Sequence, residues 1–492
     1  LVPSFGYPPS DLLFSQGIVD NLYQPAVPTG RLSAKTPEHV SIYLDKVEQY
    51  ESANSSPQEW MKNILHFGGG NNVSEQNAFA SYLSNYKQIV EAPYFGGTVK
   101  RFLKTSSDPF QINLSDSIKH LIDNGVSIMT FFGHAAGIGF DVSVNNPAEW
   151  NNYGKYPFLQ ANSCYAGDIY VDGNSSEEFV LIENKGVIGY LASISLGMPW
   201  ALNIYSDELY RQISYKSYRK SIGEIIKNTI DSIQLSEITL KETCLTMTLH
   251  CDPAIIINSF EKPDYTINQQ NIFFDPPDVT SELDSFNIII VSTNIGRAIV
   301  DSFVVQVVRT FPDGVTTETY YSRISAPFFK DSLFLKLPVD ITKGLGLNKI
   351  KITLDVFNEI DEISEINNST EVQLFIKSSD IVPVYPYKYA VIPSLPVILK
   401  ASTGYPFLGA TDFEFQLDTT DAFNSPVKQI FHINHTGGVI SWTPAFPITT
   451  DSIVYYWRVS IDSNSIHNYN WRESSFQYIS GTRLMSWRLW SS

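Results

Sequence analysis

Two stretches decide the fold of this chain: Ser127-Ile-Met-Thr-Phe-Phe-Gly-His134 and Phe158-Leu-Gln-Ala-Asn-Ser-Cys164. In each, a short apolar run ends in small and chemically active residues, which is typical of a buried strand that leads into a loop. Short apolar runs of this kind alternate with amphipathic segments between about residues 60 and 260. This alternation predicts βαβ units and a mostly parallel sheet.

Cap residues and hydrophobic periodicity predict the elements of this α/β region. One helix is opened by Thr36 and Pro37 with Val40, Tyr43, Leu44 and Val47 on one face; a second starts at Ser74; a third runs from Ser115 to Gly125; and a fourth spans 177–185. The expected strands are residues 63–67, 98–102, 127–132, 158–161, 187–192 and 254–257. We expect all of these elements to pack around one sheet.

After about residue 265 the helical period stops, and alternating strands separated by Pro, Gly, Asn and Asp take over. These strands predict one β-sandwich over residues 286–376 and another over 393–479, joined by a Pro-rich linker over 382–386. We therefore divide the chain into an α/β domain over 1–262, sandwiches over 263–380 and 381–480, and a tail over 481–492.

Composition excludes several classes of function. The 492 residues carry 51 acidic and 34 basic side chains, for a formal charge of −17. Phosphate binding needs clustered Lys and Arg, so we expect no nucleic-acid partner and no binding to an anionic membrane surface. Three cysteines cannot build a disulfide framework. No EF-hand spacing occurs, and we expect neither a metal nor a cofactor.

Other features concern where the protein acts. No run of 18 apolar residues predicts a membrane-spanning helix. Abundant Tyr and Phe, with Asn and Ser in the turns, suit an extracellular β-rich protein. The chain begins at Leu1 without a signal segment, so we expect a leader to have been removed or to lie upstream. We also expect the N-terminal part of the α/β domain to be missing.

His134 and Cys164 each follow a predicted strand, and the carboxyl ends of parallel strands meet at one edge of a sheet. Imidazole and thiol at neighbouring strand ends would suit a hydrolase in which His134 helps to form the thiolate of Cys164. The backbone N–H groups of Cys164 and Ala135 would hold the oxyanion. The alternative is a packed thiol beside a hydrogen-bonded histidine without chemistry.

Several segments, taken in order, resemble the gingipain-like cysteine peptidases, family C25 of clan CD, which share a caspase-like fold. They are residues 7–11 (YPPSD), 28–34 (PTGRLSA), 43–51 (YLDKVEQYE), 64–70 (ILHFGGG) with Glu75, 131–134 (FFGH), 162–164 (NSC) and 250–254 (HCDPA). The resemblance implies an α/β caspase-like, gingipain-type catalytic domain followed by two all-β sandwich modules. Two positions depart from the family pattern, where glycine is usual: Ala135 and Cys251.

The resemblance also assigns roles. It makes Cys164 the nucleophile and His134 the acid and base, and it offers Glu75 as the orienting carboxylate, although an acid in the first turn of a helix is also explained by the helix dipole. It places Ser193 and Trp200 at the substrate pocket. Asp168 and Asp207 are candidates for a pocket carboxylate. Asp11 and His66 are interpreted as structural, and Cys244 and Cys251 as packed thiols.

The β modules add a second resemblance. Residues 292–296 (STNIG) and 362–368 (EISEINN) are similar to a CARDB-type adhesion domain, and 455–459 (YYWRV) with 471–475 (WRESS) to a fibronectin type III domain. This order resembles the surface peptidases of the type IX secretion system of Bacteroidota, including PorU-type sortases. It implies action at the cell surface or outer membrane, on secreted proteins that carry a C-terminal sorting domain, beside other outer-membrane proteins of that system. The alternative is a catalytically silent scaffold or adhesion component.

Overall fold

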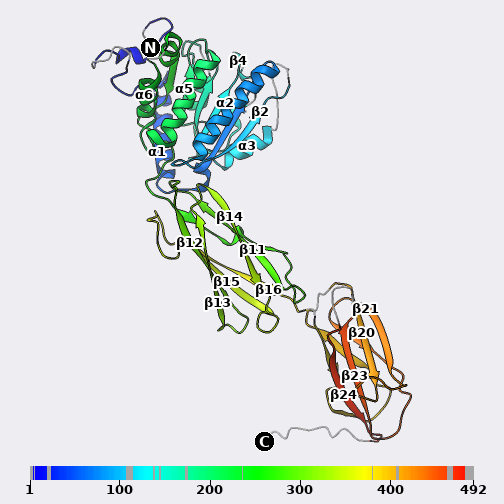
Figure 1. Ribbon diagram of the computed structural model, residues 1–492. Helices are drawn as coiled ribbons and strands as arrows, with labels where there is room; N and C mark the ends of the chain where they lie inside the picture. Colours follow the sequence, from blue (N-terminus) through cyan, green and yellow to red (C-terminus); the bar gives the residue numbers. More distant parts are fainter. Residues whose placement is uncertain are drawn as a thin grey trace.

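The computed structural model describes residues 4, 6–18, 24–106, 115–136, 139–142, 144, 146–171, 175–234, 237–378, 380–405, 409–462 and 469–481. They form three bodies in a row, first an α/β domain and then two β-sandwiches (Figure 1). This confirms the predicted fold class. Of the predicted tail, all but Gly481 lies outside the described residues. No helix among the described residues is long and apolar enough to cross a membrane.

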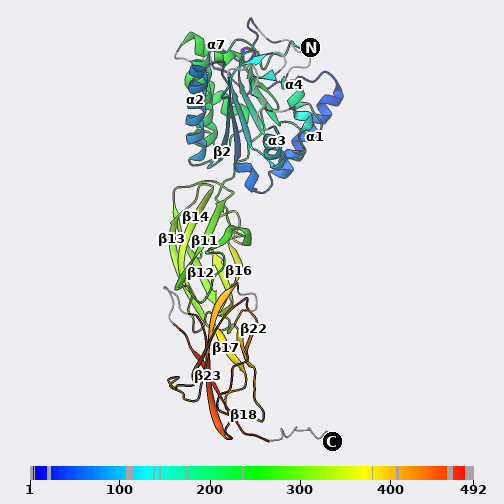
Figure 2. The same cartoon turned by 90° about the vertical axis from the view of Figure 1, so that its right-hand side faces the viewer.

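The α/β domain contains a six-stranded sheet in the order β2-β1-β3-β6-β7-β8. The first five strands in this order are parallel, and β8 pairs antiparallel with β7. Figure 2 shows α2 on one side of the sheet and α1, α3 and α4 on the other. Both faces are therefore covered, which is why β3, β6 and β7 are apolar and fully buried. The strands are β1 (Asn63–Gly68), β2 (Thr98–Leu103), β3 (Ile128–Phe132), β6 (Phe158–Asn162), β7 (Gly189–Ser193) and β8 (Met247–His250).

The helices of this domain are α1 (Pro37–Ala53), α2 (Val73–Glu91), α3 (Ser115–Asn124), α4 (Ser175–Val180), α5 (Pro199–Arg211), α6 (Ile222–Ile233) and α7 (Ile238–Thr246). A two-strand hairpin, β4 (Ala135–Ala136) and β5 (Gly139–Phe140), follows β3. Short 3-10 turns occupy η1 (Leu12–Phe14), η2 (Glu59–Lys62) and η3 (Pro147–Glu149), and a π-helical turn, η4 (Gln212–Lys216), extends α5.

Several predicted elements of this domain were wrong. Residues 254–257 form no strand, because Asp252 accepts a hydrogen bond from the N–H of Ala254 in a turn, and the buried edge strand is β8 just before it. The helix expected over 177–185 ends at Val180. Helix α2 is capped by Asn72 rather than opened by Ser74. The prediction also missed α5, α6 and α7, although the Ser221 and Glu224 capping box of α6 is visible in the sequence.

The buried face of α1 also differs from the prediction. Val40 and Leu44 are exposed, whereas Tyr43, Lys46 and Tyr50 are buried. The Lys46 ammonium donates to the carbonyl oxygens of Val180 and Val187, and burial lowers its pKa to about 7. Backbone acceptors between α4 and β7 thus place Lys46 on the buried face of α1, whereas the pattern predicted Leu44 there.

The second body is a sandwich of two four-stranded sheets. One has the order β10-β11-β14 with β9 beside β11, and the other the order β13-β12-β15-β16. The elements are β9 (Tyr265–Thr266), η5 (Gln269–Asn271), β10 (Ile272–Asp275), β11 (Ser285–Asn294), β12 (Ser302–Thr310), β13 (Thr317–Ser325), β14 (Lys330–Pro338), β15 (Gly346–Thr353) and β16 (Ser369–Ile376).

The third body is a second sandwich, with sheets β17-β19-β22 and β18-β24-β23-β20-β21. The predicted linker over 382–386 was wrong, because most of it belongs to β17, an edge strand with a bulge between Pro383 and Tyr385. Proline is tolerated there since an edge strand leaves N–H groups unpaired. The strands are β17 (Ile381–Tyr385), β18 (Ala390–Ile392), β19 (Leu399–Thr403), β20 (Thr411–Asp418), β21 (Gln429–His435), β22 (Val439–Trp442), β23 (Ile453–Ile461) and β24 (Arg472–Tyr478).

The α/β domain contacts the first sandwich through the loop that follows α2. The N–H of Ala298 donates to the carbonyl oxygen of Tyr94 at 2.8 Å, and the Arg297 guanidinium lies 3.6 Å from the centre of the Tyr94 ring. Gly96 has a φ of +60°, and a Cβ on it would lie 2.4 Å from Cβ of Ala298 and 2.5 Å from the carbonyl oxygen of Phe328. The two domains touch here without room for a side chain.

We predict that Gly96→Ala lowers the stability of the protein more than the matched substitution Gly314→Ala does. Gly314 also has a positive φ, of +72°, but open space around it. Gly96→Ala and Gly314→Ala should both cost about 1–2 kcal/mol for the left-handed backbone. Only Gly96→Ala should add about 1–3 kcal/mol of overpacking. Thermal unfolding and protease cleavage near residues 259–263 would measure the difference, and equal losses would contradict the contact.

Candidate active site

Parallel pairing of β3 with β6 brings the two predicted reacting groups to one edge of the sheet. The last paired residues are Phe132 and Asn162, and the N–H of Gly133 continues the pairing by donating to the carbonyl oxygen of Asn162 at 3.2 Å. His134 and Cys164 each follow two residues beyond the last pair. The structure therefore places the imidazole and the thiol on adjacent loops.

The loop after β7 holds the thiol of Cys164. The N–H of Gly197 donates to Sγ at 3.3 Å, and the carbonyl oxygen of Gly197 lies 3.9 Å from Sγ. Both polar backbone groups of Gly197 thus face the sulfur of Cys164. Tyr165, the next residue, has a φ of 54°, an uncommon conformation for a tyrosine. Cys164 thus sits on a sharp turn with its side chain half-exposed.

Glu75 lies against the imidazole of His134, with Oε2 3.0 Å from Nε2. Glu75 is the third residue of α2, and its Oε2 also accepts a hydrogen bond from the N–H of Asn71 at 2.8 Å. These bonds, first that from Asn71 and then that from His134, hold the pKa of the Glu75 carboxyl below its usual value. The carboxylate can accept Nε2–H, which leaves Nδ1 as the basic nitrogen of the His134 ring.

The predicted oxyanion donors are Cys164 and Ala135. The N–H of Asp141 donates to the carbonyl oxygen of His134 at 2.9 Å, so these two residues form a hydrogen-bonded pair of the β4–β5 hairpin. In an antiparallel ladder the next pair, Ala135 with Phe140, is not hydrogen-bonded, and its N–H groups point outward. No acceptor among the described residues takes the N–H of Cys164. These two N–H groups are the candidates for binding an oxyanion.

Of the two predicted pocket residues, Ser193 ends β7 and Trp200 lies on the segment that follows it. Ser193 is buried, and its Oγ accepts from the N–H of Ser195 and donates to the carbonyl oxygen of the same residue, so it shapes the loop. Trp200 is 37% exposed in the first turn of α5. Leu196 and Met198, on either side of Gly197, are exposed. From residue 193 to residue 204 no side chain is charged.

The two candidate pocket carboxylates are engaged elsewhere. Asp207 pairs with Arg211 one turn later on α5, and it also accepts a hydrogen bond from Asn85 of α2. Asp168 accepts the N–H of Tyr170. We call the uncharged residues 193–204 the wall of the site.

The residues that we interpreted as structural are buried in the domain, and one of them forms an ion pair. His66 is buried, with Nε2 2.8 Å from the Tyr210 hydroxyl, and burial lowers its pKa to about 3. Cys244 and Cys251 are buried, and burial raises the pKa of Cys244 to about 12 and that of Cys251 also. Asp11 forms an ion pair with Arg31. Of the three thiols, that of Cys164 is the exposed one.

Sequence reasoning missed two residues that contact the site. Gly197 acts through its backbone N–H, which no side-chain pattern reveals. Asp141 accepts a hydrogen bond from the N–H of His134, and it follows a hairpin that has no sequence motif. The sequence shows only that Asp141 is an acidic residue seven positions after His134.

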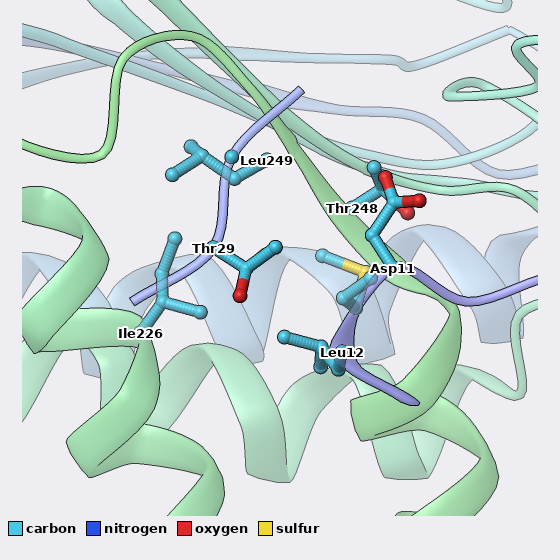
Figure 3. Close-up of a pocket in the computed structure, with 8 residues that line it drawn as sticks. Asp11, Leu12, Thr29, Ile226, Thr248 and Leu249 are labelled. Atoms are coloured by element: carbon cyan, nitrogen blue, oxygen red, sulfur yellow. The ribbon is translucent and has the colours of Figure 1, made fainter. Parts of the chain in front are cut away.

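Two other features contain none of the predicted catalytic residues. Figure 3 shows a pocket whose labelled lining residues come from the N-terminal segment, α6 and β8, and none of them is a predicted catalytic residue. In the last sandwich, Glu414, His432 and Asp462 have ligand atoms within 4.8 Å of one another. Nδ1 of His432 already lies 3.1 Å from Oδ2 of Asp462, and Tyr469 donates to the Glu414 carboxylate. We assign no metal to this group.

Comparisons with known proteins found a matching family and similar solved structures. A family model described as peptidase family C25 matches residues 1–258. One similar solved structure, the complex of RgpB pro- and mature domains from Porphyromonas gingivalis, is 13% identical and covers 75% of this chain and 81% of that chain, with a TM-score of 0.42. A structure described as a protease is 14% identical, with 74% and 78% covered and a TM-score of 0.41.

A smaller solved structure is similar to part of the chain. The CARDB domain of a Pyrococcus furiosus protein, in complex with di-metal ions, is 21% identical and covers 24% of this chain and 91% of that chain, with a TM-score of 0.19. A comparison with curated proteins gave no match.

We predict that Glu75→Gln slows alkylation of Cys164 by roughly 100-fold, at the low end for a positioned acid and base. The amide keeps the shape but loses the charge that holds Nε2–H. Because the pKa of Glu75 is lowered, its contribution should be present at pH 4.5 and above and fade only as pH falls through that lowered value. Alkylation rates against pH, with the intact mass as readout, would measure this.

The matched control is Asp116→Asn, which removes an acid from the first turn of α3, where no histidine partner is found among the described residues. Both variants lose a negative charge that stabilises the first turn of a helix. If this were the only role of Glu75, both substitutions would act only by lowering the stability of the protein. If Glu75→Gln and Asp116→Asn alter the alkylation rate equally, Glu75 is a helix-capping acid and not the partner of His134.

Proposed function

Because the chain belongs to peptidase family C25, we propose that it is an active cysteine peptidase in which Cys164 attacks a peptide carbonyl and His134 carries the proton. The observation that carries this proposal is the 3.0 Å contact of Glu75 with His134 on the loop beside the thiol. A histidine held by a carboxylate on one nitrogen is oriented to act as a base with the other.

The reaction follows from these positions. Nδ1 of His134 takes the thiol proton, and the Cys164 thiolate attacks the carbonyl carbon. The N–H groups of Cys164 and Ala135 stabilise the negative oxygen of the tetrahedral intermediate. The protonated imidazole then gives its proton to the departing amine, the C–N bond breaks, and a thioester to Sγ remains. Water or an amine attacks this thioester and regenerates the thiol.

The substrate is inferred from the segment after β7. The N–H of Gly197 contacts the thiol, so Leu196 and Met198 lie beside the reacting atom. With no charged side chain between residues 193 and 204, this wall offers nothing to neutralise a lysine or an arginine. We therefore favour cleavage after an uncharged, apolar side chain.

The finer role is that of a sortase-like transpeptidase of the type IX secretion system. On this proposal the enzyme works at the cell surface or outer membrane, removes a C-terminal sorting domain from secreted proteins and passes the acyl group to an amine. Other outer-membrane proteins of the system would be its partners. The support is the order of a peptidase domain and two β modules, with the sequence resemblance of both.

The alternative is a catalytically silent scaffold, and one observation favours it. Ala135 stands where the family commonly has glycine. A scaffold would keep Cys164 and His134 in place and bind a partner without forming a thioester. The reactivity of the thiol separates the two functions.

We predict that peptidyl chloromethyl ketones label Cys164 and neither of the other two thiols, because Cys244 and Cys251 are buried and their pKa values are raised. A leucyl or methionyl reagent should react faster than a lysyl or arginyl one. His134→Ala should slow labelling by about 100-fold or more, since the base is lost. Peptide mass mapping reads the site, with Cys164→Ala as the control.

Absence of labelling at Cys164 in the reduced, folded protein would support the silent scaffold and contradict the peptidase. Faster reaction of the lysyl or arginyl reagent would contradict the uncharged pocket and leave the peptidase intact.

We further predict that a protein ending in a sorting domain is cleaved and joined to an added primary amine, such as a glycine peptide. The expected product has the mass of the amide, because the amine competes with water for the thioester. Intact mass spectrometry measures the ratio of amide to acid, and Cys164→Ala should give neither. Acid as the sole product at every amine concentration would contradict the sortase role.

A further inference from the structure

The carboxylate of Asp141 contacts loops at the carboxyl ends of three neighbouring strands. Its Oδ2 accepts the N–H of Gly70, after β1, at 2.8 Å, and its Oδ1 accepts the N–H of His134, after β3, at 3.3 Å. The ammonium of Lys104, directly after β2, lies 3.5 Å from Oδ2. A side chain on the β4–β5 hairpin thus joins segments that are far apart in the sequence.

The carboxylate fills a space that glycines leave for it. A Cβ on Gly69 would lie 2.0 Å from Oδ1 of Asp141, and a Cβ on Gly133 would lie 2.6 Å from the same atom. The two glycines belong to the loops after β1 and β3, which also bond directly through the N–H of Gly69 and the carbonyl oxygen of Phe132. The backbone of both loops is fitted around this carboxylate.

Asp141 and Lys104 are both buried, at 4% and 3% exposure. A buried ion pair often contributes little net stability, because desolvation of two charges offsets their attraction. Stability alone therefore gives no reason for a charged pair here. Asp141 instead bonds the loops after β1 and β3, which carry the residues of the site, and this placement indicates another role.

The positions of Glu75 and of His134 both depend on the loops after β1 and β3. The N–H of Gly70 binds Asp141, and the next N–H, that of Asn71, binds Oε2 of Glu75. On the other side, Asp141 bonds His134 twice, by its side chain to the N–H and by its own N–H to the carbonyl oxygen. A single carboxylate thus fixes the backbone that carries each partner.

Resting on the proposed function, we propose that Asp141, paired with Lys104, is a positioning residue for this peptidase. It sets the imidazole of His134 against Glu75, and so presents Nδ1 to the thiol of Cys164, without itself touching the substrate. The geometry of a base matters on this scale, because small displacements of reacting groups lower rates strongly.

Asp141→Asn tests the proposal. One amide oxygen cannot accept both N–H groups as the two carboxylate oxygens do, so the loops should separate. We expect the rate of Cys164 labelling to fall by about 10- to 100-fold, its pH profile to shift, and the KM for a peptide substrate to change little. The control Asp11→Asn breaks another partly buried ion pair, that with Arg31, away from these loops, and should lower thermal stability without changing the pH profile.

The double variant Asp141→Asn with Lys104→Met separates position from stability, because it also removes the buried ammonium that has lost the charge of Asp141. If the proposal is correct, it regains thermal stability and stays slow. Recovery of the full rate together with stability would overturn the proposal, and so would a single variant with the wild-type rate and pH profile.

A second measurement keeps this test apart from the proposed function. If the wild-type thiol is not labelled, the peptidase proposal fails, and the position of His134 is read by NMR of ¹³C-labelled histidine instead, with His134→Gln for assignment. Asp141→Asn should shift the imidazole resonance and its titration midpoint, and Asp11→Asn should leave both unchanged. An unchanged His134 resonance in Asp141→Asn would overturn the positioning role.

Discussion

Parallel pairing of β1, β3, β6 and β7 places their four carboxyl ends at one edge of the sheet, and every feature of the candidate site depends on this edge. The loop after β1 carries the backbone that holds Glu75, the loop after β3 carries His134, and that after β6 carries Cys164. The loop after β7 supplies the N–H of Gly197 to the thiol. The helices on both faces keep these strands dry, so that the polar loops extend from a rigid core.

Three thiols in the same domain show how environment separates chemistry from packing. Cys244 and Cys251 lie in the core, where burial disfavours the charged form and raises their pKa values. Cys164 differs because its side chain is half-exposed instead of lying within the core, and because a backbone N–H points at its sulfur. The same distinction separates the two histidines, since His66 is held neutral by burial while His134 contacts an ionised carboxylate.

Buried charges mark the places where backbone segments are joined. Lys46 bonds two carbonyl oxygens at the end of α4, and the Asp141 and Lys104 pair joins the loops after β1, β2 and β3. An unpaired charge in such a position would be costly, so each of these groups commits the surrounding backbone to one arrangement. These buried polar side chains bond to specific backbone groups, which an apolar side chain cannot do.

The sequence by itself determined the parallel α/β domain, its principal strands and the two β-sandwiches, because strand runs and turn residues are local signals. It also determined His134 and Cys164 as candidates, since each ends such a run. It failed for residues 254–257 and 382–386, where a turn and an edge-strand position override composition. Only the tertiary structure decided the contact of Glu75 with His134, the donor from Gly197 and the place of Asp141. These are contacts between loops distant in sequence, and their distances are set by how strands pair and not by any pattern along the chain.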